Sequence, residues 1–323
     1  MNDIVSSARE RAARLPSLLA GPTCPDARDD GRVTTSSASK SLMIAPYQDK
    51  TARHFFEYCR DVGHPLDWIC HDDLAWGRIG SKEVARICDR ASGIYLRETM
   101  YVTQQEVAVA SCLRALASTN ANILGCAPAS TNWSKPLHLL HLSREADVDC
   151  SVTEYSVQSR LDCSSGNVRK GLSGVPTFVG LVDSRSKHSE LIPSLLQPYL
   201  DGREIRIHVV DDKVFAHQLT KKAGHIDYRV GGLSSVDPFE LDDRIAAYAR
   251  RITRREQLRF SGIDAISVGD ALRVLEVNPM PGYHSFELSG GRPYAISAEL
   301  ISVLSGSRAG LLKRRSRSAS AGG

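Results

Sequence analysis

The sequence predicts an α/β fold with α+β elements, in which an open domain of parallel strands comes first. Two patterns lead to this prediction. Buried strands alternate with amphipathic helices between residues 41 and 116, an order typical of parallel sheets. Longer strands with a period of two follow between residues 204 and 278. The chain has 323 residues, 42% of them apolar and 24% charged, which is enough for a large core and two or three subdomains.

An N-terminal α/β domain is predicted over residues 41–130. Its first helix is capped by Asp49 and stops at Gly63, because glycine readily takes the left-handed conformation at a helix end. No GxGxxG fingerprint follows the first strand, which argues against a dinucleotide-binding domain. The predicted elements are, in order, a strand at 41–45, a helix at 49–63, strands at 66–70 and 93–97, and a helix that begins at the capping box of Thr103 and Glu106.

A central subdomain is predicted over residues 131–200, and it combines one helix with short strands. The helix covers about 134–146, with Ser134 as its cap and Pro136 in its first turn. Short strands are predicted near 150–157, 167–170 and 179–182, followed by an extended segment at 193–200.

A C-terminal subdomain is predicted over residues 201–306. Its first two strands, at 204–210 and 214–219, are joined by a turn at Asp212-Lys213 and should pair antiparallel. The segment Asp237-Pro-Phe-Glu240 is predicted to open a long helix with one apolar stripe. The remaining elements are strands at 260–266 and 272–278 and a closing helix at 293–304.

Charge and cysteine content exclude several classes of protein. The net charge of +4 comes from the C-terminal tail, whose lysines and arginines between residues 308 and 317 leave a nearly neutral body that is not expected to bind nucleic acid. The eight cysteines form no CxxC pair, which argues against a zinc site or a disulfide framework. No stretch approaches the length of a membrane span, and we predict a cytoplasmic protein. Both ends, 1–40 and 307–323, are predicted to be disordered.

Three oxygen-bearing side chains late in the chain form the most informative motif. Glu276 and Asn278 alternate along one strand, so they point to the same face, and Asp264 ends a neighbouring strand. Carboxylate and amide oxygens suit a hard cation such as Mg²⁺. Two acids in a partly dry site repel each other unless a cation lies between them. Taken alone, the same residues could also be solvated carboxylates on an exposed strand.

A second set of polar residues lies on the strand at 204–210. The period of two places Glu204, Arg206 and His208 on one face, opposite three apolar residues. This face is either exposed to solvent or directed at a ligand rich in hydroxyls and phosphates, because unpaired buried charges are costly. Asp227 and Arg229 repeat the pattern, and Lys170 precedes a glycine-containing turn whose amides could approach a phosphate.

Taken in order, these segments resemble the ATP-grasp superfamily of carboxylate–amine ligases, and most of all its RimK-type and peptide-macrocyclase branch. The resemblance runs from about residue 41 to 305, with all blocks in the family's order. It implies an ATP-grasp fold in which residues 131–200 form the nucleotide-binding and lid subdomain. The blocks that carry the resemblance are Ser134-Lys-Pro136, Lys170-Gly-Leu-Ser-Gly174, Leu196 to Val210, Asp227-Tyr-Arg229, Ser261-Gly-Ile-Asp264 and Leu275 to Gly282.

The resemblance also implies a role for each matching residue. The expected cofactors are ATP and one or two Mg²⁺ ions, with Mn²⁺ as an alternative metal. Gln197 stands where relatives often carry Glu, a change that keeps an acceptor for adenine. The implied roles are phosphate binding for Lys135 and Lys170, adenine binding for Gln197 and Tyr199, ribose binding for Glu204, catalysis for Arg206 and Arg229, and metal binding for Asp264, Glu276 and Asn278. His208 matches no role and fits a structural imidazole, whereas His284 could contact substrate.

The implied reaction converts a carboxylate into an acyl phosphate, which an amine attacks to give an amide, ADP and phosphate. The expected partners are therefore a small-molecule or peptide acid and amine, without a membrane or nucleic acid, and relatives that pair through their central subdomains imply a homodimer. Two versions stay open, namely a ligase for small amino-acid conjugates and a maturase that closes lactams or esters in a ribosomal peptide. A non-catalytic ATP-binding regulatory protein on the same fold is the other class.

Overall fold

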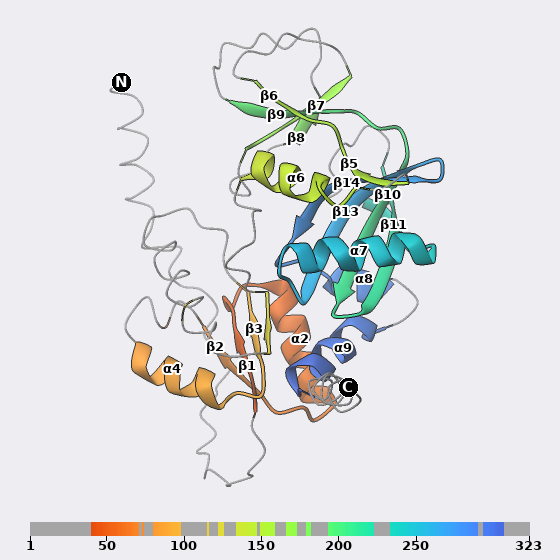
Figure 1. The fold of residues 1–323 in the computed structure, drawn as a ribbon. Coiled ribbons are helices and arrows are strands. Elements are labelled where there is room, and N and C mark those ends of the chain that lie inside the picture. Colours follow the sequence, from red (N-terminus) through yellow and green to blue (C-terminus); the bar gives the residue numbers. More distant parts are fainter. Residues whose placement is uncertain are drawn as a thin grey trace, which may run out of the picture. The chain divides into compact units, whose positions relative to one another are not determined.

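A computed structural model of the protein describes twelve segments of the chain, all within the compact unit Ser39–Gly323. Outside these segments lie the predicted capping box at Thr103 and Glu106 and the two predicted disordered ends, of which only residue 40 is described. In this part of the chain three sheets are present (Figure 1). The described residues are 40–70, 73, 80–97, 115, 122–125, 134–146, 149–158, 166–172, 179–181, 193–222, 233–289 and 293–306.

The first sheet is built from the N-terminal part of the chain, and all its strands are parallel. Its order is β2-β1-β3-β4, and the parallel pairing agrees with the open α/β domain predicted from the sequence. The helix after the first strand starts where predicted, because the Asp49 side chain accepts hydrogen bonds from the amides of Thr51 and Ala52. The elements are β1 (Ser41–Ile44), α2 (Lys50–Asp61), β2 (Leu66–Ile69), α4 (Ser81–Arg90), β3 (Ile94–Leu96) and β4 (Ile123–Leu124).

The central part of the chain forms a small antiparallel sheet of order β6-β9-β7-β8. It is preceded by α6 (Lys135–Ser143). The N-cap residue Ser134 makes no side-chain capping bond, so the start of this helix depends on Pro136 in its first turn. The strands are β6 (Ser156–Gln158), β7 (Asn167–Lys170), β8 (Val179–Leu181) and β9 (Ser194–Pro198). The short strand β5 (Cys150–Val152) instead joins the third sheet, in parallel with β14.

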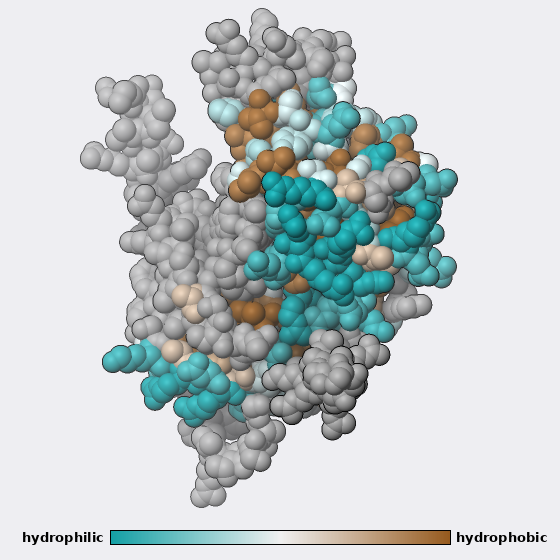
Figure 2. Space-filling view, in the orientation of Figure 1, coloured by the Kyte–Doolittle hydropathy of each residue, from teal (hydrophilic) through white to brown (hydrophobic). Residues whose placement is uncertain are grey.

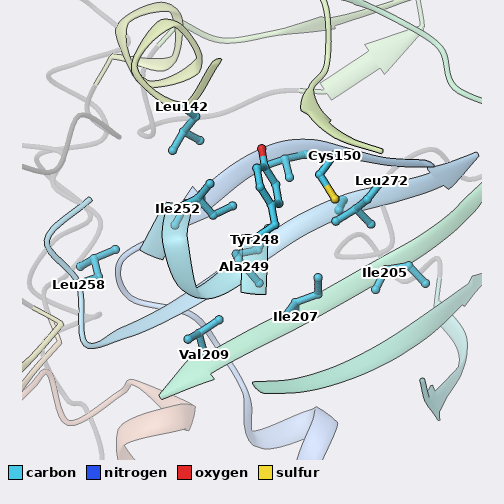
Figure 3. Close-up of a cluster of buried hydrophobic side chains, with 14 residues drawn as sticks. Leu142, Cys150, Ile205, Ile207, Val209, Tyr248, Ala249, Ile252, Leu258 and Leu272 are labelled. Carbon is cyan, nitrogen blue, oxygen red and sulfur yellow. The ribbon is translucent and has the colours of Figure 1, made fainter. Parts of the chain in front are cut away.

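The third sheet is the largest and has the order β12-β11-β10-β13-β14-β5. One face packs against α7 (Asp243–Arg255), and this core contains Ile205, Ile207 and Val209, as the period of two in their strand predicts (Figure 3). In Figure 2 the outward face of α7 is hydrophilic, as expected for an amphipathic helix. The strands are β10 (Arg203–Val210), β11 (Lys213–Lys221), β12 (Leu233–Pro238), β13 (Phe260–Val268) and β14 (Ala271–Asn278).

The predicted start of the long helix at Asp237-Pro-Phe-Glu240 is wrong. Asp237 and Pro238 are the last residues of β12, which pairs with β11 as far as Pro238, and Phe239 and Glu240 follow the strand. The helix begins at Asp243, because the side chain of Asp242 accepts a hydrogen bond from the amide of Arg244. A proline suits the end of an edge strand as well as the first turn of a helix, and here the pairing of β12 with β11 makes it the end of a strand.

The second face of the third sheet packs against α8 (His284–Ser289) and α9 (Ala295–Leu304) and shares its core with the first sheet. This shared cluster joins Phe55 on α2, Tyr95 on β3 and Phe260 on β13. Gly93 lies so close to α9 that a Cβ there would be 2.6 Å from the carbonyl oxygen of Leu304. Among the described residues no helix is long and apolar enough to cross a membrane.

Candidate active site

The strand register brings the predicted metal ligands onto one face of the third sheet. Asp264 on β13 lies directly opposite Glu276 on β14, and Asn278 lies opposite Gly262. Arg206 on β10 lies opposite Asp264 on the other side of β13. Three adjacent strands therefore place the acids, the amide and one guanidinium side by side.

Two ion pairs extend this arrangement into a row of alternating charge. Nη1 of Arg206 lies 2.5 Å from Oδ1 of Asp264, and Nζ of Lys135 lies 3.2 Å from Oε2 of Glu276. The four side chains are only 4–20% exposed. Two carboxylates can stand opposite each other here because each has its own cation. Lys135, at the first turn of α6, thus faces the same site as the predicted metal ligands.

Gly262 is required by the close approach of Arg206. A Cβ at this position would overlap the guanidinium of Arg206 and lie 2.5 Å from Cβ of Pro281. An isolated glycine inside a strand pattern signals such an approach, and this signal was present in the sequence but not used. Arg206 also lies 6.0 Å from the ring centroid of Phe286.

The predicted phosphate and adenine residues lie on or beside the small antiparallel sheet. Lys170 is half-buried on β7, and the amide of Lys135 donates to the carbonyl of Leu172, 2.8 Å away, which ties α6 to the segment that follows β7. Gln197 on β9 is only 2% exposed, and within the described part of the chain neither its amide nitrogen nor its oxygen has a hydrogen-bond partner. A buried unpaired amide is costly, so a ligand that bonds it fits this position.

Other predicted site residues have partners of their own. Oε2 of Glu204 lies 3.2 Å from Nζ of Lys221. Tyr199 is exposed, and its amide donates to the carbonyl of Gly166 at 2.7 Å. Oδ1 of Asn278 accepts from the amide of Met280 at 2.8 Å, which shapes the loop after β14. Asp227 and Arg229 lie outside the described residues.

Two histidines near the site have pKa values below the usual value for histidine. Burial, with Arg206 and His217 as further causes, lowers the pKa of His208 well below its usual value, in agreement with a structural role. Burial also lowers the pKa of His284, with His54 and Arg97 acting in the same direction. Nδ1 of His284 lies 3.0 Å from Oγ1 of Thr51, so it joins α8 to α2.

Arg97, which the sequence did not single out, holds the loop that follows the predicted metal strand. Its Nη1 donates to the carbonyl of Pro281 at 2.9 Å, and its Nε lies 2.9 Å from Oδ2 of Asp49. Arg97 is buried at the end of β3, so the first sheet supports the loop from outside the third sheet. The sequence carries no signal for this contact, because 184 residues separate Arg97 from Pro281.

The predicted metal site contains two acids and one amide. Within the described residues no group of three His, Cys, Asp or Glu side chains could hold a metal ion. The oxygen set of Asp264, Glu276 and Asn278 nevertheless matches Mg²⁺, which uses one or two carboxylates and completes its shell with water and phosphate.

Comparisons with known proteins identify the fold. Residues 181–304 match the family model of the RimK-like ATP-grasp domain, and no curated protein sequence matches the chain. The solved structure of the ATP-grasp ligase PsnB complexed with a minimal precursor is similar, with a TM-score of 0.64, 20% identity, and coverage of 82% of this chain and 98% of that chain. The macrocyclase MdnC from Microcystis aeruginosa MRC, bound with precursor peptide MdnA, has a TM-score of 0.60 at 16% identity, covering 82% and 99%.

D-alanine–D-alanine ligase from Bacillus anthracis has a TM-score of 0.53 at 13% identity, covering 83% of this chain and 97% of that chain. The protein therefore has the ATP-grasp fold, and residues 181–304 form a RimK-like ATP-grasp domain. The predicted fold class is confirmed, the match over residues 181–304 agrees with the RimK-type resemblance, and the comparisons agree with the ATP-dependent ligase expected from the sequence. The domain boundaries, the homodimer and the cytoplasmic location stay predictions.

Proposed function

We propose that the protein is an ATP-dependent ligase that joins a carboxylate to an amine through an amide bond. The observation that supports this most is the row of Lys135, Glu276, Asp264 and Arg206 on one face of the third sheet. A cluster of two acids and two bases on adjoining elements suits a reaction in which anionic groups must be brought together. A protein that only binds nucleotide has little need for all four.

Each residue has a role in this proposal. Lys135 and Lys170 would hold the phosphates of ATP, Gln197 would bond adenine through its buried amide, and Arg206 would face the transferred phosphoryl group. One or two Mg²⁺ ions, or Mn²⁺, held by Asp264, Glu276 and Asn278, would neutralise the charge of the phosphates. Arg229 would stabilise the oxyanion that forms when the amine attacks.

The direct test uses purified protein with Mg·ATP and panels of carboxylates and amines. ADP release should require both substrates and should be accompanied by an amide product detected by mass spectrometry. Glu276→Gln should abolish turnover, whereas Glu83→Gln, at an exposed position of α4 beside the first sheet, should retain it. ATP hydrolysis without any amide product across a broad panel would contradict the proposal.

A peptide acceptor is favoured by a cavity of about 370 Å³ beside β11. Its walls include Phe215, Phe239 and Phe286, which are apolar. Within the described residues, β12 pairs with β11 from His217 onward and the amide of Phe239 donates to the carbonyl of Ala216, so the sheet edge beside the cavity is the part of β11 before Ala216. An extended peptide can add to such an edge while its apolar side chains enter the cavity. Similar structures of PsnB and MdnC contain the precursor peptides PsnA2 and MdnA.

We therefore propose a maturase of ribosomal peptides as the more specific function. A candidate precursor from a neighbouring reading frame, incubated with enzyme and Mg·ATP, should lose one water for each bond formed. Phe239→Asp in the cavity wall should raise the KM for the peptide and leave the KM for ATP unchanged. Equal turnover of free amino acids and peptides, insensitive to this substitution, would favour the small-molecule ligase instead.

A further inference from the structure

The residue between two predicted metal ligands is held by an imidazole from another element. Val277 lies between Glu276 and Asn278 on β14, and its amide donates to Nε2 of His138 at 3.0 Å. His138 lies on α6 and is only 1% exposed. The contact is therefore a buried hydrogen bond to the backbone of the predicted metal strand.

The imidazole lies beside a part of β14 for which the described residues provide no strand on that side. β5 pairs with β14 from Leu272 to Val274, and the amide and hydroxyl of Thr153 still bond the carbonyl of Val274. Further along, the described residues give β14 only β13 as a strand partner. A buried backbone N–H needs an acceptor, and His138 supplies one for Val277.

The direction of the hydrogen bond determines which ring nitrogen of His138 carries the proton. Because Nε2 accepts from Val277, the ring proton is on Nδ1, which lies 3.4 Å from Oε2 of Glu256. Glu256 follows α7, is fully buried, and also has Nδ1 of His141 2.8 Å from its Oε1. An ionised carboxylate only accepts, so it favours the tautomer of His138 that the contact with Val277 needs.

The same helix connects this contact to the phosphate-binding lysine. Lys135 and His138 lie one turn apart on α6, and they contact the consecutive residues Glu276 and Val277. A shift of the end of β14 would therefore change the ion pair and the imidazole contact together. The distance between the lysine and the metal ligands is thus set by two contacts, one to a side chain and one to the backbone.

We propose that Glu256 and His138 form a positioning pair that holds Glu276 and Asn278 in place against Lys135. This inference rests on the proposed function, because it assigns the pair to the binding of Mg·ATP. His138 is a positioning residue and does not itself touch metal or nucleotide. Residues that orient metal ligands typically change metal affinity by about 10- to 100-fold when they are replaced.

The test measures the binding of a fluorescent, non-hydrolysable ATP analogue as Mg²⁺ is titrated. His138→Ala and Glu256→Gln should each raise the Mg²⁺ concentration at half-maximal binding about tenfold or more, and amide hydrogen exchange at Val277 should become faster. In Glu256→Gln the new amide N–H can face Nδ1 of His138 and favour the tautomer that cannot accept from Val277. His138→Gln, whose side-chain oxygen can accept from Val277, should recover part of the Mg²⁺ response.

His141→Ala is the matched control, because His141 shares Glu256 but does not contact β14 in any described interaction. Its Mg²⁺ titration should stay close to that of the wild type. A folded His138→Ala or Glu256→Gln protein with fast exchange at Val277 and an unchanged Mg²⁺ titration would overturn the inference. So would a failure of His138→Gln to differ from His138→Ala. A wild-type protein that binds no analogue would instead refute the proposed function, while exchange at Val277 would still report the hydrogen bond.

Discussion

Each acid of the candidate site is held by a base that comes from a different element. Asp264 is paired with Arg206 from the neighbouring strand, and Glu276 with Lys135 from α6. Burying charged groups costs free energy, and only close pairing offsets this cost. A contribution to fold stability alone therefore does not explain why these four charged residues are buried here. The proposed binding of a triphosphate and a carboxylate would explain them, because cations that are already in place stabilise such anionic groups.

At Gly262, replacement by alanine should disturb this arrangement without adding or removing a charge. The new Cβ would push against Arg206 and Pro281, and we expect a loss of about 1–3 kcal/mol in unfolding free energy together with most of the activity. Urea unfolding and ADP release measure the two effects. Gly80→Ala is the control, because a Cβ there meets no atom within 4 Å. Full activity of Gly262→Ala would show that Arg206 need not occupy this position.

His208 should make the stability of the protein depend on pH. Burial, then Arg206 and His217, lower its pKa, so the folded protein takes up this proton only far below pH 6.5, whereas the unfolded chain does so near 6.5. The unfolded state therefore binds more protons below about pH 6.5, and the unfolding free energy falls as the pH falls through that range. His208→Asn should reduce the difference in unfolding free energy between pH 7.5 and pH 5.5 by up to about 1.4 kcal/mol.

Urea unfolding of both proteins at the two pH values measures this effect. The comparison uses the pH difference within each protein, because the substitution also removes buried contacts with Phe286 and His217. The lowered pKa values of His217 and His284 leave some pH dependence in the variant. An unchanged pH difference would mean that His208 is protonated equally in the folded and unfolded states.

Strands and helices could be predicted from the sequence wherever one local pattern decides them. β10 alternates with a period of two, β14 does so over most of its length, and α2 has both an Asp49 cap and a Gly63 stop, so these elements lie close to their predicted bounds. The start of α7 could not be predicted, because the residues around Pro238 fit a strand end and a helix start equally. Only the pairing of β12 with β11 distinguishes them.

From the sequence one could predict which candidate site residues share a face of the sheet, but not which of them contact one another. The period of two placed Glu276 beside Asn278 and Arg206 beside His208, and the register confirms both pairs on one side of the sheet. The ion pair of Lys135 with Glu276 joins elements that are far apart in sequence and depends on how α6 packs on β14. No local pattern carries that information.

The helices that pack beside the first sheet should protect two buried cysteines from alkylation. Cys59 on α2 and Cys88 on α4 face the core, and burial raises the pKa of Cys59 to about 12 and that of Cys88 to about 11, with Asp89 as a further cause for Cys88. Since the thiolate is the reactive form, iodoacetamide at about pH 8 should leave both unlabelled in the native protein and label both in urea. Peptide mapping by mass spectrometry measures this. Labelling of Cys59 under native conditions would show that α2 opens locally.

At the scale of the whole molecule, the first and third sheets share a core and a buried arginine. The shared cluster joins residues of α2, β3, β13 and α9, and Arg97 bonds both Asp49 of the first domain and Pro281 in the loop after β14. Two sheets that are packed in this way should unfold as one cooperative unit. The loop that follows the predicted metal strand should then be as stable as the rest of this unit, which suits the proposed role of Glu276 and Asn278 as metal ligands.

Replacement of Arg97 by Gln should lower the unfolding free energy of this unit by about 3 kcal/mol, because it leaves the partly buried Asp49 carboxylate without its cation. Trp68 lies on β2 of the first sheet, so the fluorescence of a protein in which Trp76 and Trp133 are replaced by Phe reports that sheet, whereas far-UV circular dichroism reports all elements. Both signals should shift to the same lower urea midpoint, and the exposed Arg90→Gln should leave it unchanged. If fluorescence changed first while most of the dichroism persisted, the first sheet would unfold alone, and its contact with the loop at Pro281 would add no stability to the predicted metal site.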